Sequence, residues 1–300
     1  MEVMINVASL FLIMLIGVLA FKKKIISDEI QIGLANILLK ITLPLLVVTS
    51  FGVEFEEGIG EKVIQCFFYS ILSIILAAII SSLFLLKMKD KEKKKILQFA
   101  NVFSNCGFIG FPLINSVLGL EGVLYTSIFN MIFTIGLWTY GVLLYSNKFD
   151  KKEIKSVLTN PCIVAVYVGL ILMIFNIQLP TFINKSFKIV GDMTTPLSMI
   201  IIGCILAKAK IKNYIKDFTI YYSAVLKLLL LPLVGIGIAY IIKDNSILMK
   251  TMILIQAMPA ATMTSILAEK YNLKVEYSAV IVFITTLLSI ITFPIITMLI

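Results

Sequence analysis

Apolar residues fall along this chain in blocks of about 20, and most of the charged residues lie in the short segments between the blocks. A helix of about 20 apolar residues is long enough to cross a bilayer. The pattern therefore predicts an all-α polytopic membrane protein that forms a single transmembrane domain over residues 1–300. Ten transmembrane helices are expected, near residues 3–21, 30–52, 63–86, 96–118, 122–146, 160–177, 192–208, 218–242, 248–269 and 277–299.

The lysines predict how these spans are oriented. The first apolar block is longer than the core of a signal peptide, and lysines follow it rather than precede it, which favours a retained span with the N-terminus outside. In that orientation, 19 of the 26 lysines lie in the inside segments or at their edges, and five lie outside. Cytoplasmic loops carry such an excess of lysine. We therefore expect a multi-pass protein of the cell membrane with both termini extracytoplasmic.

Composition narrows the chemistry that the chain can perform. It is 60% hydrophobic with a mean hydropathy of +1.04, and its pI of 9.2 reflects loop lysines rather than a nucleic-acid surface. Without His or Arg, it lacks the usual near-neutral proton carrier and the guanidinium fork that grips carboxylates. The four cysteines lie within apolar spans and lack CxxC spacing, as expected of small buried residues. We expect no enzyme activity, no cofactor, no metal site and no nucleic-acid partner.

The two halves of the chain place their prolines and glycines alike. Pro44 and Pro196 lie 152 residues apart, and Gly17 and Gly169 have the same offset. Because each half would hold five spans, an odd number, the second half would enter the membrane from the opposite face. The sequence therefore predicts inverted repeats, which many secondary transporters contain, although chance recurrence among eight prolines is the alternative. The repeats are expected over residues 1–146 and 160–300.

The fourth span is interrupted in its middle. Proline lacks the N–H that a helix needs, and glycine lets the backbone leave helical angles. We expect an unwound stretch near 105–111, with the proline in the first turn of a second half-helix. The residues assigned to a binding site here are Asn105, Gly107, Gly110 and Pro112.

The ninth span repeats this pattern from the other side of the membrane. Gln256 precedes Pro259 by three residues, and Ala260 begins a run of small residues where another backbone can come close. We expect the second half-helix to open at the proline. Unwound backbone at membrane depth needs burial in protein or contact with water. Helices 4 and 9 are therefore predicted to be broken, to cross at the midplane and to line a binding site.

Such a crossing leaves the charge of the ligand open. Half-helix N-termini offer N–H groups and partial positive charge to an anion, at about 0.3–1 kcal/mol each. The opposing C-terminal carbonyls offer oxygen ligands to a cation such as sodium. The residues above leave both uses open.

Polar residues inside other spans are further candidates for the site. Lys40 and Lys227 would be charges at membrane depth, which are functional candidates, although a lysine can also snorkel to the surface. A buried Lys227 would pair with a substrate carboxylate or with backbone carbonyls. Asn130 would flank the site or form an interhelical hydrogen bond. We expect Asp192 and Glu269, at predicted span ends, to contact water.

Two stretches, "ANVFSNCGFIGFPLINSVLGLEG" and "QAMPAATMTSILAEKYN", resemble the auxin efflux carrier family, including its bacterial members, which are related to the bile acid/sodium symporter-like fold. The resemblance implies that spans 4 and 9 cross at their prolines, with Asn105, Pro112 and Pro259 lining the substrate site. It also implies a scaffold of spans 1, 2, 6 and 7, against which the other spans move. Plant members have Asn where this chain has Ala260, which puts the plant substrate in doubt. Bacterial relatives are associated with organic acids such as malate.

These observations favour a secondary transporter that exports a small organic anion, a carboxylate such as malate or an auxin-like acid, by alternating access with an elevator-type moving unit. The alternative is a sodium-coupled organic anion importer of the bile-acid transporter type. A passive channel would show no saturation and no counterflow, and an intramembrane enzyme would find few acid–base groups in these spans. The expected partners are the anion and the lipid bilayer, with a homodimer through the scaffold helices as a further expectation.

Overall fold

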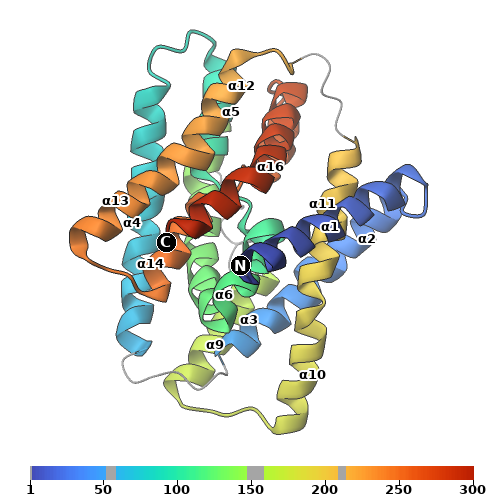
Figure 1. The fold of residues 1–300 in the computed structure, drawn as a ribbon, viewed down its shortest axis with the longest axis vertical. Helices are drawn as coiled ribbons and strands as arrows, with labels where there is room; N and C mark the ends of the chain where they lie inside the picture. The colour runs from blue at the N-terminus through green and yellow to red at the C-terminus, as the bar shows by residue number, and fades with distance from the viewer. Residues whose placement is uncertain (1, 52–58, 147–158, 209–213) are drawn as a thin grey trace. The chain divides into compact units, whose positions relative to one another are not determined.

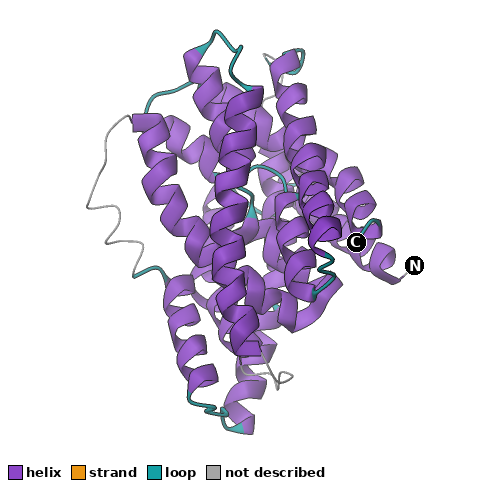
Figure 2. Ribbon diagram, turned by 90° about the vertical axis from the view of Figure 1, so that its left-hand side faces the viewer, coloured by secondary structure: helices purple, strands orange, loops and turns teal. Residues whose placement is uncertain are grey.

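The computed structural model describes residues 2–51, 59–146, 159–208 and 214–300. Every regular element in these ranges is a helix, and they contain no strand (Figure 2). Six helical segments of the described part are long and apolar enough to cross a membrane, and three shorter apolar helices accompany them. The prediction of an all-helical polytopic membrane protein is confirmed. The count of ten spans and their inverted relation stay predictions. Much of the lysine-containing sequence after the predicted fifth and seventh spans lies outside the described residues.

The chain forms two compact units, and each takes segments from both halves of the sequence. The first unit holds residues 1–67, 107–131 and 155–208, and the second holds residues 68–106, 132–154 and 209–300. The first contains α1 (Glu2–Lys22), α2 (Asp28–Ile37), η1 (Leu38–Thr42), α3 (Leu43–Phe51), the start of α4 (Ile59–Phe84), most of η2 (Cys106–Gly110) and of α6 (Phe111–Gly136), α9 (Pro161–Ile174), α10 (Thr181–Asp192) and α11 (Thr194–Lys208). The second contains the rest of α4, α5 (Lys91–Val102), the end of α6, η3 (Leu137–Gly141), α7 (Val142–Ser146), α12 (Phe218–Val225), η4 (Leu226–Leu230), α13 (Leu231–Ile242), α14 (Ile247–Gln256), α15 (Met263–Lys270) and α16 (Val275–Met298).

Glycines set the closest helix packing in the first unit, where α1 lies along α11 and α9 lies along α3. A Cβ atom on Gly203 would clash with the carbonyl oxygen of Met14 and would lie 2.8 Å from the Cα atom of Gly17. A Cβ atom on Gly169 would meet the ring of Phe51. Close backbone approach of this kind is typical of small residues at interfaces between membrane helices. The packing of α1 on α11 therefore depends on Gly203 having no side chain.

A buried hydrogen bond joins two threonines of the first unit. The hydroxyl of Thr194 donates to the hydroxyl oxygen of Thr42 at 3.0 Å. Thr42 closes η1 and Thr194 opens α11, so the bond lies where α3 and α11 begin. The two threonines are 152 residues apart, the offset that also relates Pro44 to Pro196.

Wide helical turns precede prolines in this chain. Three of the four π turns in the described part end two residues before a proline, which is Pro44 after η1, Pro112 after η2 and Pro232 after η4. A proline ring clashes with the carbonyl four residues earlier, and a π turn widens the backbone at that level. The expectation of an unwound stretch at 105–111 is therefore wrong in part, because η2 occupies most of it. Pro112 is the second residue of α6, close to the position predicted for it.

Two helical segments bear on the predicted ends of the fourth, fifth and seventh spans. Gly119 has a φ angle of 66° inside α6, so it separates the predicted fourth and fifth spans. The seventh span begins earlier than expected, because α10 continues into α11 as one 28-residue apolar segment (Figure 1). The sequence pattern did not indicate this start, because α10 contains lysines. Asp192 therefore lies inside a span and not at its end, although it is exposed, as is Glu269 near the end of α15.

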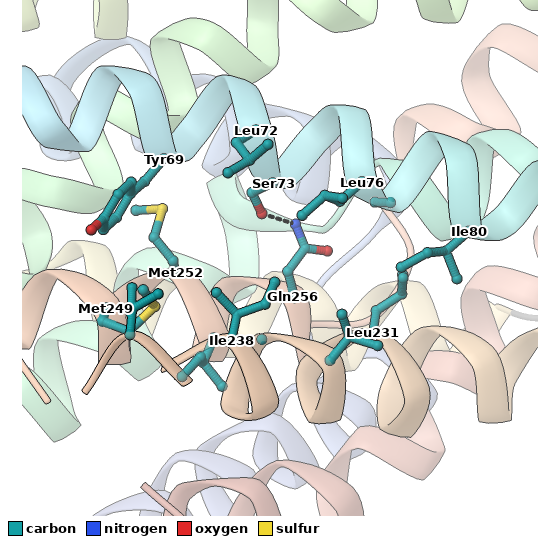
Figure 3. A pocket seen from close by; sticks show the side chains of 15 residues that line it. Tyr69, Leu72, Ser73, Leu76, Ile80, Leu231, Ile238, Met249, Met252 and Gln256 are labelled. Carbon is teal, nitrogen blue, oxygen red and sulfur yellow. Dashed lines mark hydrogen bonds between the residues drawn. The ribbon is translucent and has the colours of Figure 1, made fainter. Parts of the chain in front are cut away.

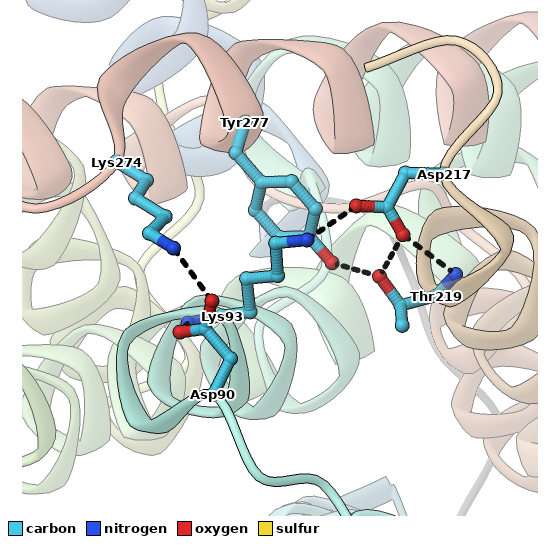
Figure 4. A network of polar contacts seen from close by, with 6 residues as sticks. All are labelled: Asp90, Lys93, Asp217, Thr219, Lys274 and Tyr277. Carbon is cyan, nitrogen blue, oxygen red and sulfur yellow. Dashed lines mark hydrogen bonds and ion pairs between the residues drawn. The ribbon is translucent and has the colours of Figure 1, made fainter.

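A polar network joins α5, α12 and α16 at one end of the second unit (Figure 4). Asp90 and Asp217 cap the N-termini of α5 and α12. The carboxylate of Asp90 also accepts a hydrogen bond from the ammonium of Lys274 at 2.5 Å, and that of Asp217 accepts one from Lys93 at 2.5 Å. The bond from Lys274 holds the pKa of Asp90 below its ordinary value. Partial burial acts to raise the pKa of Asp217, but the bonds from Lys93 and Thr219 outweigh it and leave this pKa lowered.

The lowered pKa values predict that mild acid weakens the second unit. A carboxyl group with a lowered folded-state pKa contributes stability above its unfolded pKa, about 3.9, and loses that contribution as pH falls through the folded-state pKa. We expect the thermal midpoint of the purified protein to fall as the pH is lowered from about 5 to 3. The double variant Asp90→Asn, Asp217→Asn should flatten that dependence, whereas Asp192→Asn, outside the network, should not. A wild-type slope in the double variant would show that other groups cause it.

Candidate functional site

Two helices of the second unit, α5 and α14, end in interruptions that are bonded to each other. After α5 and α14 end, the chain continues in short extended segments, residues 103–105 and 259–261, which we call the crossover. Ser104 and Ala260 form an antiparallel bridge there. Two backbone hydrogen bonds close the bridge, from the N–H of Asn105 to the carbonyl of Pro259 at 2.8 Å and from the N–H of Ala261 to the carbonyl of Phe103 at 2.9 Å. The backbone groups freed by the two breaks thus satisfy one another.

The crossover occupies N–H groups just after Pro259, which a half-helix N-terminus would otherwise offer to a ligand. Besides the two bonds of the bridge, the N–H of Ala260 donates to the hydroxyl oxygen of Thr285 on α16 at 3.2 Å. The expectation that the second half-helix opens at Pro259 is wrong, because α15 begins only at Met263. The helix starts late because the bridge holds residues 259–261 in an extended backbone, which cannot also be helical.

A buried lysine lies against the crossover. Lys227, in η4, has no exposed surface, and its ammonium donates to the hydroxyl oxygen of Ser104 at 2.6 Å and to the carbonyl of Asn101 at 3.1 Å. An ammonium group has three N–H donors, so these bonds account for two of them. Among the described residues, no carboxylate forms an ion pair with it. Lys227 therefore places a buried side-chain amine, with no carboxylate partner among the described residues, beside the crossover.

Other buried polar side chains hold this arrangement in place. The side-chain amide of Asn101 donates to the hydroxyl oxygen of Ser81 at 3.0 Å, and its amide oxygen accepts a bond from Ser223 at 2.7 Å. We call these residues the crossover cluster: Ser81, Asn101, Ser104, Ser223 and Lys227. Every member is at most 1% exposed. A buried network whose members are bonded in this way is rigid and holds its groups in fixed positions.

Gln256 lies at the end of α14, just before the crossover. Its side-chain amide nitrogen donates to the hydroxyl oxygen of Ser73 at 2.6 Å. Its amide oxygen is buried and accepts no hydrogen bond from the described part of the chain. Gln256 therefore brings a polar group without a described partner to a cavity that α4 also lines.

The ten predicted site residues divide between the two units. Asn105, Gln256, Pro259, Ala260 and Lys227 belong to the second unit, where the first four lie in or next to the crossover and Lys227 contacts it. The other five belong to the first unit: Gly107 and Gly110 in η2, Pro112 and Asn130 in α6, and Lys40 in η1. Lys40 is exposed and Asn130 is half-buried. Their membership of a common binding site stays a prediction.

Sequence reasoning missed the side chains that support Lys227. Asn101 and Ser104 are three residues apart, and Ser223 and Lys227 are four apart, so each pair shares a helix face or its continuation. These were visible as polar pairs inside apolar spans. Nothing in the sequence, however, indicated that one pair faces the other, because they are more than 100 residues apart.

Comparison with known proteins identifies the family. The chain is 26% identical over 233 residues to an uncharacterised transporter of Methanocaldococcus jannaschii, covering 75% of this chain and 72% of that protein. It is 25% identical over 296 residues to an uncharacterised transporter of Methanothermobacter thermautotrophicus, covering 96% and 95%. Residues 2–297 match the family described as membrane transport protein, which is the auxin efflux carrier family. The resemblance carried by the two broken spans is therefore confirmed, and the chain belongs to the membrane transport protein family of membrane transporters.

Proposed function

We propose that this transporter exports a small organic anion, a carboxylate such as malate or an auxin-like acid, and binds it next to the crossover. The observation that carries the proposal is the buried ammonium of Lys227 beside Ser104. A lysine at the centre of a membrane helix costs about 2.5–3.5 kcal/mol on insertion scales. Such a charge is expected to have a partner, and no described carboxylate supplies one. An anionic substrate would supply it during part of each transport cycle.

The same contacts argue against sodium coupling, the alternative. In transporters with broken helices, carbonyls at the C-terminal end of a half-helix coordinate the cation. Here the carbonyl of Asn101, in the last turn of α5, accepts a hydrogen bond from Lys227 instead. A sodium ion at that oxygen would have to compete with the lysine for it. We therefore favour an anion carrier that does not require sodium.

Pairs of contacts in the first unit support an inverted repeat. An offset of 152 residues relates Gly17 to Gly169 and Phe51 to Gly203, and Gly17 packs on Gly203 as Phe51 packs on Gly169. The Thr42–Thr194 bond joins two residues with the same offset. Because each compact unit takes segments from both halves, we infer that one unit moves against the other in an elevator-type cycle.

Transport by the purified protein in liposomes tests the proposal. We expect saturable efflux and counterflow of a carboxylate such as malate, in the absence of sodium. Asn105→Ala should lower the rate at least about tenfold, which corresponds to about 1.4 kcal/mol of lost transition-state stabilisation. Asn36→Ala, which removes an exposed amide of α2, is the matched control. Undiminished transport in Asn105→Ala would refute the site, and a strict sodium requirement would favour the importer.

A further inference from the structure

A cavity in the second unit is lined by three helices, α4, α13 and α14, and by no residue of the crossover cluster (Figure 3). Its volume is about 320 Å³, at the lower end of the range of about 300–1,000 Å³ for small-molecule sites. Fifteen residues line it, and none of them is charged. The cavity is therefore suited to an uncharged molecule, because burying an unpaired charge there would cost far more than burying a neutral polar group.

The lining residues form one stripe on each helix, which makes the cavity elongated. On α4 they run from Tyr69 to Ile80 at spacings of three or four residues, and α13 and α14 contribute similar stripes. Eleven residues of helix correspond to about 16 Å. Leu72 in this lining is 50% exposed and Ile242 is 49% exposed, so the cavity reaches the apolar surface of the protein. A ligand of this shape would enter from the lipid.

One polar group in the cavity lacks a partner. Gln256 is 6% exposed, and its amide nitrogen is held by Ser73, whereas its amide oxygen points away from Ser73 toward Leu231 and Ile80 (Figure 3). That oxygen accepts no hydrogen bond within the described residues. The hydroxyl of Tyr69, at the other end, already donates to Asp244 at 3.4 Å. A buried carbonyl oxygen left without a donor is destabilising, because the hydrogen bonds that it made to water are not replaced.

We propose that this cavity binds an uncharged, elongated apolar molecule that donates one hydrogen bond, from an O–H or N–H group, to the amide oxygen of Gln256. The apolar body lies along the stripe of α4, and the donor group completes the hydrogen bonding of the glutamine. The site is separate from the anion site of the proposed function, since its lining carries no positive charge. Because Gln256 ends α14 three residues before Pro259, the bound molecule contacts the last turn of the helix that leads into the crossover.

Photolabelling of the protein in lipid nanodiscs tests this site. The probe is an octanol that carries a diazirine, and adducts are mapped by peptide mass spectrometry. We expect adducts on the cavity-facing residues of α4, α13 and α14, and competition by excess octanol. Loss of one neutral hydrogen bond weakens binding by roughly two- to tenfold. The Gln256→Leu variant and the methyl ether of the probe, which has no donor, should each reduce these adducts by that factor.

Gln98→Leu provides the matched control, because Gln98 on α5 also has a buried amide oxygen without a described partner but does not line the cavity. It should label like the wild type. Adducts spread evenly over the apolar helices would overturn the proposal in favour of partition into lipid alone. Equal labelling by the alcohol and the ether would overturn the hydrogen bond. The ether comparison uses the wild-type protein, so it decides the matter even if Gln256→Leu does not fold.

Discussion

Replacing Lys227 by methionine should lower anion transport by about ten- to a hundredfold while leaving the protein folded. Hydrogen bonds to charged groups contribute about 1.5–3 kcal/mol, and about 1.4 kcal/mol corresponds to a factor of ten. Methionine keeps the apolar stem of the lysine but removes the ammonium beside Ser104. Two effects on stability oppose each other, because the variant loses two hydrogen bonds but no longer buries a charge. Initial rates in liposomes and melting curves of the same preparations measure both.

Lys250→Met is the matched control for this experiment. Lys250 is a partly exposed lysine on α14, and the change removes the same charge without touching the crossover cluster. It should retain wild-type transport. If Lys227→Met transports at the wild-type rate, the ammonium only supports the backbone of α5 and the anion binds elsewhere. Equal losses in both variants would point to net charge rather than to a specific contact.

Among glycine-to-alanine substitutions in the first unit, Gly203→Ala should lower the stability of the protein most. The added Cβ would meet backbone atoms of α1, including the carbonyl oxygen of Met14, and backbone cannot rotate away as a flexible side chain can. Overpacking typically costs about 1–3 kcal/mol, and we expect the upper part of that range. The melting temperature measured in detergent should fall by several degrees, and α1 should become accessible to protease.

Gly33→Ala is the control, since no atom lies within 4 Å of its added Cβ. Alanine is a better helix former than glycine by about 0.5–1 kcal/mol, so this variant of α2 should be slightly more stable than the wild type. If Gly203→Ala lowers the melting temperature and Gly33→Ala raises it, the destabilisation comes from the α1–α11 contact and not from the change of glycine to alanine itself. A wild-type melting temperature for Gly203→Ala would contradict the close packing of these helices.

The sequence predicted an all-helical membrane protein correctly, because the length of an apolar block is a local property. The interruption of spans 4 and 9 was also local, since Pro112 and Pro259 each remove an N–H donor. The details were not local. A π turn before Pro112 absorbs the strain that would otherwise unwind the backbone, and the bridge between Ser104 and Ala260 decides where each half-helix ends. Both depend on residues brought together by tertiary structure.

Prediction of the candidate site was limited in the same way. Lys227 was recognisable as a charge in an apolar span, but its bonds to Ser104 and Asn101 join residues more than 100 positions apart. The seventh span was placed too late because the lysines of α10 made its first half look like a loop. The sequence therefore showed which polar residues to examine, but not which residues they contact or how exposed they are.

The bridge at the crossover has a consequence for how the chain is made. Ser104 leaves the ribosome 156 residues before Ala260, which at about 5–20 residues per second is roughly 8 to 30 s. During that time the backbone groups of residues 103 and 105 have no partner from the ninth span, and an unpaired backbone group is costly in lipid. The N-terminal half must therefore wait in contact with water or with the insertion machinery. The bridge can form only after the ninth span has been synthesised.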